Sequence, residues 1–512
     1  MNNTIKTILG AVFAVAVAYY ANSIIDHETH GGFLVLAGIF GAYMAMNIGA
    51  NDVANNVGPA VGSGALSIGG AIVIASIFEA GGALIAGGDV VGTIKDDIIS
   101  LSAFSEEPML FVYAMSAALL AAALWLNLAT WLKAPVSTTH SIVGGVMGAG
   151  IAAGGFAIVS WGTMGGIVAS WVVSPVLGGM IAAVFLYVIK SQILYKEDKV
   201  QAAKKVVPVL VAIMSAAFIT YITLKGFKHV WGSITQALSF LPQESKPSFN
   251  VAIIFGLIGG IVTYLIVKPR VEKKVLGLDN SRESINLLFT IPLIFSAALL
   301  SFAHGANDVA NAVGPLAAVN DALTNLAVST KASIPLWVMV TGGVGISVGL
   351  ALFGPRLIKT VGSEITELDQ MRAFSIMMAA AITVVIASQL GLPVSSTHIA
   401  VGAVFGVGFL REWLDAKDVS VKQIKLQEET AKYQALKAEL DSFEGDDYKV
   451  RLELIESTKR QKKKVKSIKR ALRENYVKRG MVKKIIAAWI ITVPAAAALS
   501  GMIYYILKGI GI

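Results

Sequence analysis

The sequence contains no cysteine, which excludes disulfide bonds, thiolate metal sites and cysteine nucleophiles. It is also poor in charge, since 15% of its 512 residues are charged and 55% are hydrophobic. A water-soluble domain of ordinary composition carries about 25% charged residues. The low charge and the mean hydropathy of +0.69 predict a membrane protein.

Signatures of several enzyme classes are missing as well. The chain has no GxxxxGK[ST] phosphate-binding loop, no HExxH and no GxSxG, so nothing indicates an ATPase or a hydrolase. The net charge of +9 is concentrated in residues 411–484, which hold 21 Lys and Arg against 13 Asp and Glu. The basicity therefore belongs to one segment. We expect no nucleic-acid partner, no covalent cofactor and no enzymatic activity.

Long apolar runs, interrupted mainly by glycine, fill most of the chain. Runs of 18 or more apolar residues are long enough to cross a bilayer. We predict an all-α polytopic membrane protein with about 12–13 transmembrane segments. The first run, near residues 5–25, could be a signal peptide, but its length and the many spans that follow favour a transmembrane helix.

Two phrases each occur twice. GANDVANNVGP at 49–59 returns as GANDVANAVGP at 305–315, an offset of 256 residues. PVSTTH at 135–140 returns as PVSSTH at 393–398, an offset of 258. Two unrelated motifs that recur in the same order at nearly the same offset indicate an internal duplication, whose halves should build one shared site.

The distribution of positive charge predicts the orientation. The basic segments 190–205, 268–283 and 411–484 should all be cytoplasmic, and the acidic segment 89–108 and the DHETH stretch 26–30 should lie outside. Seven spans then separate the two GANDVAN segments, so the two repeats enter the membrane from opposite faces. Such an inverted-topology repeat places the site near the midplane, with broken or re-entrant helices, which we expect at the PVS motifs.

The predicted organisation has six parts. They are an additional N-terminal transmembrane helix (1–30), a first repeat (31–190), connecting transmembrane helices (191–283), a second repeat (284–410), a charged cytoplasmic helical hairpin (411–482) and a last transmembrane helix of the second repeat (483–512). We expect the whole to lie in the cell membrane as a multi-pass protein with the lipid bilayer as its environment, and we leave a homodimer open.

Asp52 and Asp308 are carboxylates at membrane depth, one in each repeat. Such a group costs several kcal/mol unless it is paired or coordinates a cation. The glycines that precede them, Gly49 and Gly305, suggest that the helix breaks and restarts here, which would direct a helix N-terminus at an anion. The carboxylates suit Na⁺ or a proton. The alternative is that these residues merely cap helices in a dry bundle.

The PVS motifs should supply the other half of the site. Pro135 and Pro393 favour a helix start, which places hydroxyls and unpaired N–H groups at the beginning of each helix. The hydroxyl side chains are Ser137, Thr138, Thr139, Ser395, Ser396 and Thr397. Because the motifs contain no Lys or Arg, an anion would be held by helix ends, hydroxyls and co-bound cations.

Two further polar features break the repeat. Glu79 lies in an apolar segment whose counterpart has no Glu, and His304 stands where the first copy has Ile48. A role as cation ligand or proton acceptor competes with a plain buried, protonated Glu79. His140 and His398 occupy equivalent positions, and either a coupling role or an interhelical hydrogen bond would explain them.

The doubled GANDVAN and PVS(S/T)TH motifs resemble those of the inorganic phosphate transporter (PiT) family. That resemblance covers about residues 33–411 and implies a secondary transporter of orthophosphate with Na⁺ or H⁺. It implies a phosphate and cation site from Asn51, Asp52, Asn307, Asp308 and the hydroxyl clusters at 137–139 and 395–397. Glu79 and His304 match family positions, whereas Met377 stands where the family carries Glu.

We therefore predict a Na⁺-coupled phosphate importer. Phosphate beside two ionised aspartates needs positive charge, and protonating them near pH 7 would require a large upward pKa shift that Na⁺ does not need. Its expected sodium ligands are Asp52, Asn55, Glu79, Asp308 and Asn311. Alternatives are a proton-coupled or metal-phosphate symporter, a sulfate permease of the same fold, an anion channel or receptor, and an enzyme built on Ser137 and His140.

Overall fold

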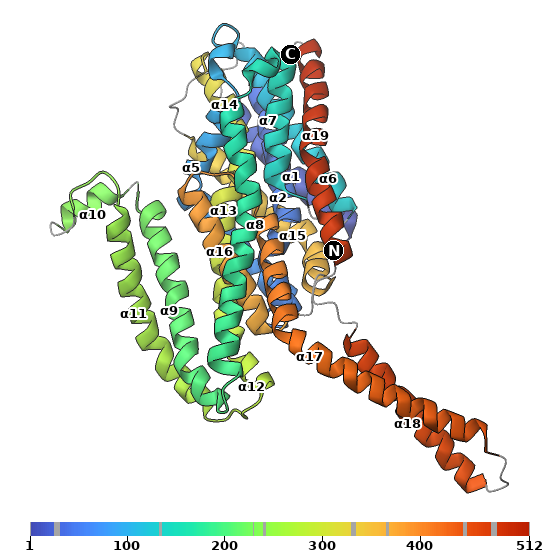
Figure 1. Ribbon diagram of the computed structural model, residues 1–512. Coiled ribbons are helices and arrows are strands. Elements are labelled where there is room, and N and C mark those ends of the chain that lie inside the picture. The colour runs from blue at the N-terminus through green and yellow to red at the C-terminus, as the bar shows by residue number, and fades with distance from the viewer. Residues whose placement is uncertain are drawn as a thin grey trace. The chain divides into compact units, whose positions relative to one another are not determined.

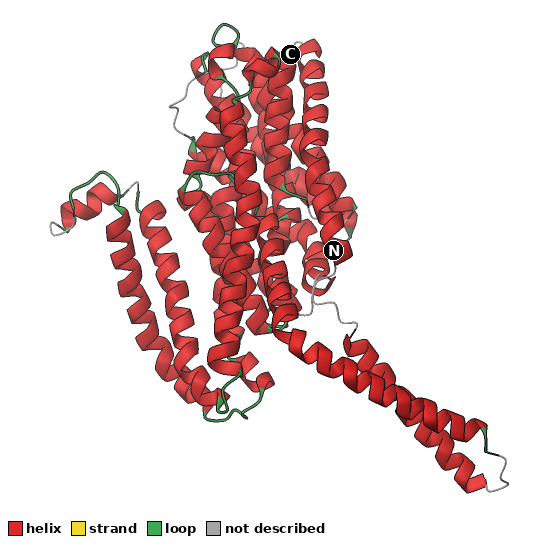
Figure 2. Cartoon of the chain, in the orientation of Figure 1, coloured by secondary structure: helices red, strands yellow, loops and turns green. Residues whose placement is uncertain are grey.

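The computed structural model of the protein describes residues 2–24, 31–132, 136–228, 230–238, 242–328, 334–364, 368–443, 448–472 and 479–510. These ranges are all-helical, with no strand and one isolated β-bridge, between Ile99 and Val159 (Figure 2). The predicted all-α fold is confirmed. Residues 26–30 and Pro135 lie outside the described ranges.

The helices follow one another with short connections (Figure 1). Up to the middle of the chain they are α1 (Asn3–Ile24), α2 (Gly31–Asn51), α3 (Val53–Gly62), α4 (Ile68–Ala86), α5 (Gly88–Gly92), α6 (Pro108–Trp131), α7 (Thr138–Gly154), α8 (Trp161–Ile189), α9 (Lys199–Gly226), α10 (Trp231–Ala237) and α11 (Phe249–Val275). Then come α12 (Arg282–Leu287), α13 (Thr290–Asp308), α14 (Ala310–Asn325), α15 (Leu336–Glu364), α16 (Gln370–Gln389), α17 (Ser396–Asp441), α18 (Tyr448–Leu472) and α19 (Arg479–Ile510).

Eleven helical segments among the described residues are long and apolar enough to cross a membrane. The sequence predicted about 12–13, and the two that fall short are those that begin at the PVS motifs. α7 has 17 residues, and α17 continues from its motif into the charged region. Both start inside the bundle, because Thr138 and Thr397 contact Asp52 at the junction of α2 and α3. They are therefore the returning arms of hairpins with α6 and α16.

The two repeats pack against each other reciprocally through glycines. An added Cβ at Gly49 of α2 would lie 1.9 Å from the carbonyl oxygen of Ile346 in α15. The counterpart contact is between α13 and α4, where a Cβ at Gly305 would lie 2.2 Å from the Glu79 carbonyl oxygen. Matching contacts between exchanged helices are what an inverted repeat requires.

A stack of four rings joins the repeats behind the hairpin turns. His140 lies against Trp171 of α8 at a ring-centroid distance of 3.7 Å, and His398 lies against Trp489 of α19 at 3.5 Å. The two imidazoles meet edge to face at 4.3 Å. These rings bury the region that follows each PVS motif and fix α7 and α17 relative to α8 and α19.

The acidic segment 89–108, predicted as an external loop, is folded into short turns. It contains α5, a π-helical turn at Thr93–Asp97 and a 3-10 turn at Leu101–Phe104. Asp89 forms ion pairs with Lys225 and Lys228. Asp89 thus anchors the start of this segment to the end of α9, whereas Glu106 and Glu107 are exposed.

Residues 408–479 form a compact unit of their own. α17 passes through residue 411, the predicted boundary, without interruption, and pairs antiparallel with α18. Buried Glu429 accepts hydrogen bonds from Gln461 and Lys464, which lower the pKa of its carboxyl to about 2. The predicted turn at 444–447 lies outside the described residues.

Candidate functional site

Asp52 lies at the meeting point of four helices and is 1% exposed. Its Oδ2 accepts a hydrogen bond from the Thr138 hydroxyl at 2.6 Å, and its Oδ1 accepts one from Thr397 at 2.9 Å. Thr138 is the fourth residue of PVSTTH, and Thr397 is the fifth residue of PVSSTH. One carboxylate therefore links the starts of α7 and α17, which are 258 residues apart in the chain.

Asp308, the second aspartate, has related but unequal surroundings. Its Oδ2 accepts a hydrogen bond from Ser396 at 3.1 Å and lies 2.9 Å from Nε2 of His304. Two asparagines one turn after the aspartates close the ring. Asn55 donates to Thr397 at 2.8 Å, and Asn311 donates to Thr138 and Thr139 at 3.1 and 3.2 Å.

Asn51 and Asn307 make a symmetric pair of contacts that the motifs alone did not reveal. Asn51 donates to the Thr130 hydroxyl at 2.8 Å, and Asn307 donates to the Ser388 hydroxyl at 2.9 Å. Thr130 and Ser388 occupy equivalent positions near the ends of α6 and α16. They could have been found by extending the repeat alignment upstream from each PVS motif.

The Gly-Ala-Asn-Asp segments are not broken as the sequence suggested. The interruption between α2 and α3 is one residue, Asp52, which keeps helical φ and ψ of −82° and −39°. In the second repeat the one-residue interruption comes one position later, at Val309 between α13 and α14. Gly49 and Gly305 are needed for close backbone approach of α15 and α4, so the expected helix N-terminus at each aspartate is wrong.

Free helix N-termini occur instead at the PVS motifs. Ser137 caps α7 by accepting the His140 N–H at 3.1 Å, and Ser395 caps α17 by accepting the His398 N–H at 3.2 Å. The N–H groups of Thr138 and Thr139, like those of Ser396 and Thr397, lie before the first intrahelical bond and carry partial positive charge. Ser137 and Ser395 cap the two helices whose first hydroxyls contact the aspartates.

Three asymmetric residues gather at one place. Glu79 is fully buried, accepts a hydrogen bond from Asn56 at 2.9 Å and lies 2.7 Å from Nδ1 of His304. His304 thereby joins Glu79 to Asp308. The corresponding residues in the other half are apolar: Ile346, Ala312 and Ile48. Asn56 and Ala312 differ at the one mismatch between the two GANDVAN phrases, a signal that the sequence reasoning overlooked.

Buried oxygen atoms without a hydrogen-bond donor mark the centre of the site. Among the described residues these include Asp308 Oδ1 and the amide oxygens of Asn51, Asn56 and Asn307. One carboxylate oxygen each from Asp52 and Asp308 and one ring nitrogen of His304, all possible metal ligands, lie within 4.8 Å of one another. Burying so many unpaired oxygens is costly, and a hard cation with oxygen ligands would relieve that cost.

Most of the predicted residues thus converge. His140 and His398 are the exceptions, because their rings contact Trp171 and Trp489 in the aromatic stack. Met377, where the resemblance led us to look for Glu, is buried in α16.

Comparisons with known proteins agree with this architecture. A model described as the phosphate transporter family matches residues 48–500. The chain belongs to the phosphate transporter family. It is thus a membrane transporter and not an enzyme. A candidate phosphate permease of Helicobacter pylori strain J99 is 48% identical, over 98% of this chain and 95% of its own. One of Chlamydia pneumoniae is 39% identical, over 74% of this chain and 89% of its own.

A solved structure supports the same assignment. It is described as the sodium-dependent phosphate transporter, and its TM-score with this chain is 0.73 at 32% sequence identity. The match covers 93% of this chain and 99% of that one. The all-helical fold of this chain is therefore shared with a solved transporter.

Proposed function

We propose that this member of the phosphate transporter family imports inorganic phosphate together with Na⁺ across the cell membrane. The observation that carries the proposal is the junction at Asp52 and Asp308. Two helix N-termini with their hydroxyls, suited to an anion, meet two buried carboxylates, suited to cations. The name of the solved relative, the sodium-dependent phosphate transporter, supports the choice of ions.

The phosphate site is formed by the first turns of α7 and α17. Its donors are the hydroxyls and N–H groups of residues 138–139 and 396–397, assisted by the amides of Asn51 and Asn307. Ser137 and Ser395 hold these turns in place. Helix N-termini bind anions without a basic side chain, because their N–H groups point outward and the helix dipole is positive there.

The first cation ligands are buried oxygens that lack a hydrogen-bond donor, namely Asp308 Oδ1 and the amide oxygens of Asn51 and Asn307. Oxygens of Asp52, Asn55, Asn311 and Glu79 complete the candidate set. Na⁺ takes such oxygen ligands and adds the positive charge that a phosphate needs beside two carboxylates. His304 sets the positions of Glu79 and Asp308.

The hydrogen bonds suggest how the two ions are coupled. In this conformation, the hydroxyls of Thr138 and Thr397 are occupied by Asp52. A cation that binds the Asp52 oxygens would compete for the same lone pairs and free both hydroxyls for phosphate. Sodium would then bind before or with the anion, and each ligand would raise the affinity for the other.

Proton coupling is the main alternative, because protonated aspartates would also remove the repulsion. The test is uptake of labelled phosphate by proteoliposomes, with either an imposed Na⁺ gradient or a pH gradient in Na⁺-free choline buffer. We expect accumulation with Na⁺ alone. Equal accumulation in choline under the pH gradient would refute sodium coupling. Competition by sulfate tests the anion, and accumulation against a gradient excludes a channel.

A further inference from the structure

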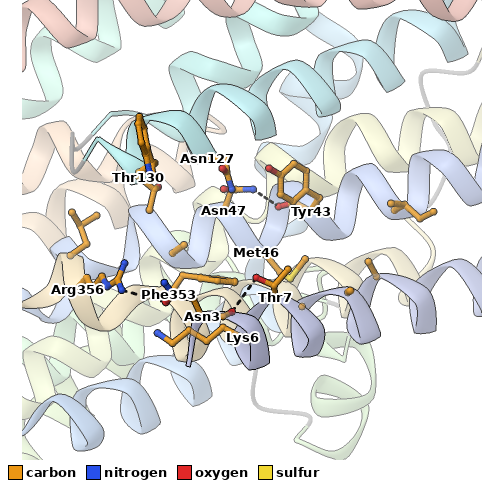
Figure 3. Close-up of a pocket in the computed structure, with 17 residues that line it drawn as sticks. Asn3, Lys6, Thr7, Tyr43, Met46, Asn47, Asn127, Thr130, Phe353 and Arg356 are labelled. Atoms are coloured by element: carbon orange, nitrogen blue, oxygen red, sulfur yellow. Dashed lines mark hydrogen bonds between the residues drawn. The ribbon is translucent and has the colours of Figure 1, made fainter. Parts of the chain in front are cut away.

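A cavity of about 560 Å³ lies between α1, α2, α6 and α15, beside the proposed phosphate site (Figure 3). Ala50 and Thr130 line the part of it nearest the site. Ala50 directly precedes Asn51, and Thr130 accepts the Asn51 hydrogen bond at 2.8 Å. The hydrogen bond between Asn51 and Thr130 therefore joins the lining of this cavity to the junction of the repeats.

The cavity has a cationic end and a polar wall. Lys6 and Arg356 line it from α1 and α15, and Arg356 donates to Asn3 at 3.3 Å. Asn47 and Asn127 add polar side chains to its lining from α2 and α6 (Figure 3). None of its described lining residues is acidic. Two cations without a lining carboxylate create a positive potential that attracts anions.

The inverted repeat supplies an internal comparison. A second cavity, of about 340 Å³, lies against α9, α13 and α16. Leu299 and Val385 line it at the positions equivalent to Tyr43 and Asn127 in the first cavity, and its described lining residues carry no charge. The two repeats therefore have cavities at equivalent positions. The first is larger and has a cationic, more polar lining, and the second is smaller and has a mainly apolar, uncharged lining.

The cationic end faces the cytoplasm in the orientation predicted from positive charge. Arg356 lies near the end of α15, and α16 begins soon after it. Asp369, the cap of α16, pairs with Arg282 at 2.7 Å, at the edge of the basic segment 268–283. Positive segments mark the cytoplasmic side of a membrane protein.

We propose that this cavity is the inner vestibule through which phosphate leaves the transporter, with the Asn51–Thr130 pair as its barrier. Lys6 and Arg356 draw the anion from the site once its cations depart. The additional helix α1 thereby forms one wall of the pathway. This inference rests on the proposed function and specifies its cytoplasmic route. The chemistry recognised is a phosphate group, so a lipid headgroup is the competing occupant.

The absence of cysteine from the chain permits a clean test. Asn127→Cys places one thiol in the vestibule, and Ala11→Cys places one on the α1 wall in case the first variant folds poorly. Each is labelled in inside-out membrane vesicles with a negatively charged, membrane-impermeant methanethiosulfonate. We expect rapid labelling, slowing by saturating phosphate with Na⁺, and loss of phosphate transport after labelling. Val385→Cys, the symmetric control, should react slowly.

The charge of the vestibule is tested on the same background. Lys6→Gln with Arg356→Gln should reduce the preference for the negative reagent over a positive one, whereas Arg270→Gln, an exposed charge elsewhere, should not. If the thiols at both positions are unreactive in a protein that transports phosphate, the assignment of the cavity as a vestibule is wrong, although the proposed phosphate transport still stands. Labelling slowed by anionic phospholipid and not by phosphate would overturn that assignment as well. Absence of transport in the unaltered protein would refute the proposed function instead.

Discussion

The two aspartates have different partners although the repeats present them in identical phrases. Both Asp52 oxygens accept threonine hydroxyls, whereas Asp308 has one serine, one nearby histidine and one oxygen without a donor. The asymmetry comes from Glu79, Asn56 and His304, which replace three apolar residues of the other half. Asp308 therefore keeps one oxygen without a donor, and Asp52 links the starts of α7 and α17.

Asp52→Asn and Asp308→Asn should each abolish Na⁺-driven phosphate uptake. Asn keeps the shape of the side chain but removes the negative charge that a cation requires. The loss of a charge-assisted interaction costs about 1.5–3 kcal/mol, or roughly 10–150-fold in affinity. Uptake into proteoliposomes is the measurement, and Asp198→Asn, a helix cap outside the bundle, is the matched control. Unaltered uptake by either site variant would contradict the assignment.

Thr138→Val and Thr397→Val should weaken phosphate binding while preserving the fold. Valine has nearly the shape of threonine but cannot donate a hydrogen bond to an anion. We expect the KM for phosphate to rise about 5–150-fold, from a loss of about 1–3 kcal/mol, and Thr→Ser to restore most of the affinity. Thr383→Val is the control for loss of a buried hydroxyl, because the Thr383 hydroxyl donates to the Ala379 carbonyl oxygen of its own helix. A KM as low as that of the control would place phosphate elsewhere.

At the scale of elements, close helix contacts account for the glycines that the sequence reasoning misread. Gly49 and Gly305 suggested a broken helix, since glycine often marks such breaks. Their actual role depends on the carbonyls of α15 and α4, which come from distant parts of the chain. The PVS motifs were easier to interpret, because proline followed by serine is a local helix-start signal that does not depend on tertiary contacts.

Gly49→Ala and Gly305→Ala should destabilise the bundle. The new Cβ atoms would meet backbone oxygens at 1.9 and 2.2 Å, which forces the helices apart and should cost at least about 1–3 kcal/mol. Gly69→Ala and Gly165→Ala are controls, because their Cβ atoms would meet nothing within 4 Å and alanine favours a helix. Thermal unfolding in detergent measures the difference. Equal melting temperatures for all four variants would refute close packing as the reason for these glycines.

For the whole molecule, much of the architecture could be predicted, because duplication and hydropathy are properties of the sequence itself. The doubled motifs indicated the inverted repeat and most residues that converge on the site. The cluster of Glu79, Asn56 and His304 could not be assembled in this way, since its members come from three segments and have no symmetric copies. Thr130 and Ser388 were missed because threonine and serine at helix ends are common and carry no distinctive signal.

If cations and phosphate share one site at the two aspartates, each must change the affinity for the other. Equilibrium binding of labelled phosphate to the purified protein can be measured over a range of Na⁺ concentrations at constant ionic strength and pH. We expect the Kd for phosphate to fall steeply as Na⁺ rises, with a log–log slope that indicates about two ions, by linkage. Asp308→Asn should flatten this dependence. A Kd that is independent of Na⁺ but changes with pH would refute the shared site.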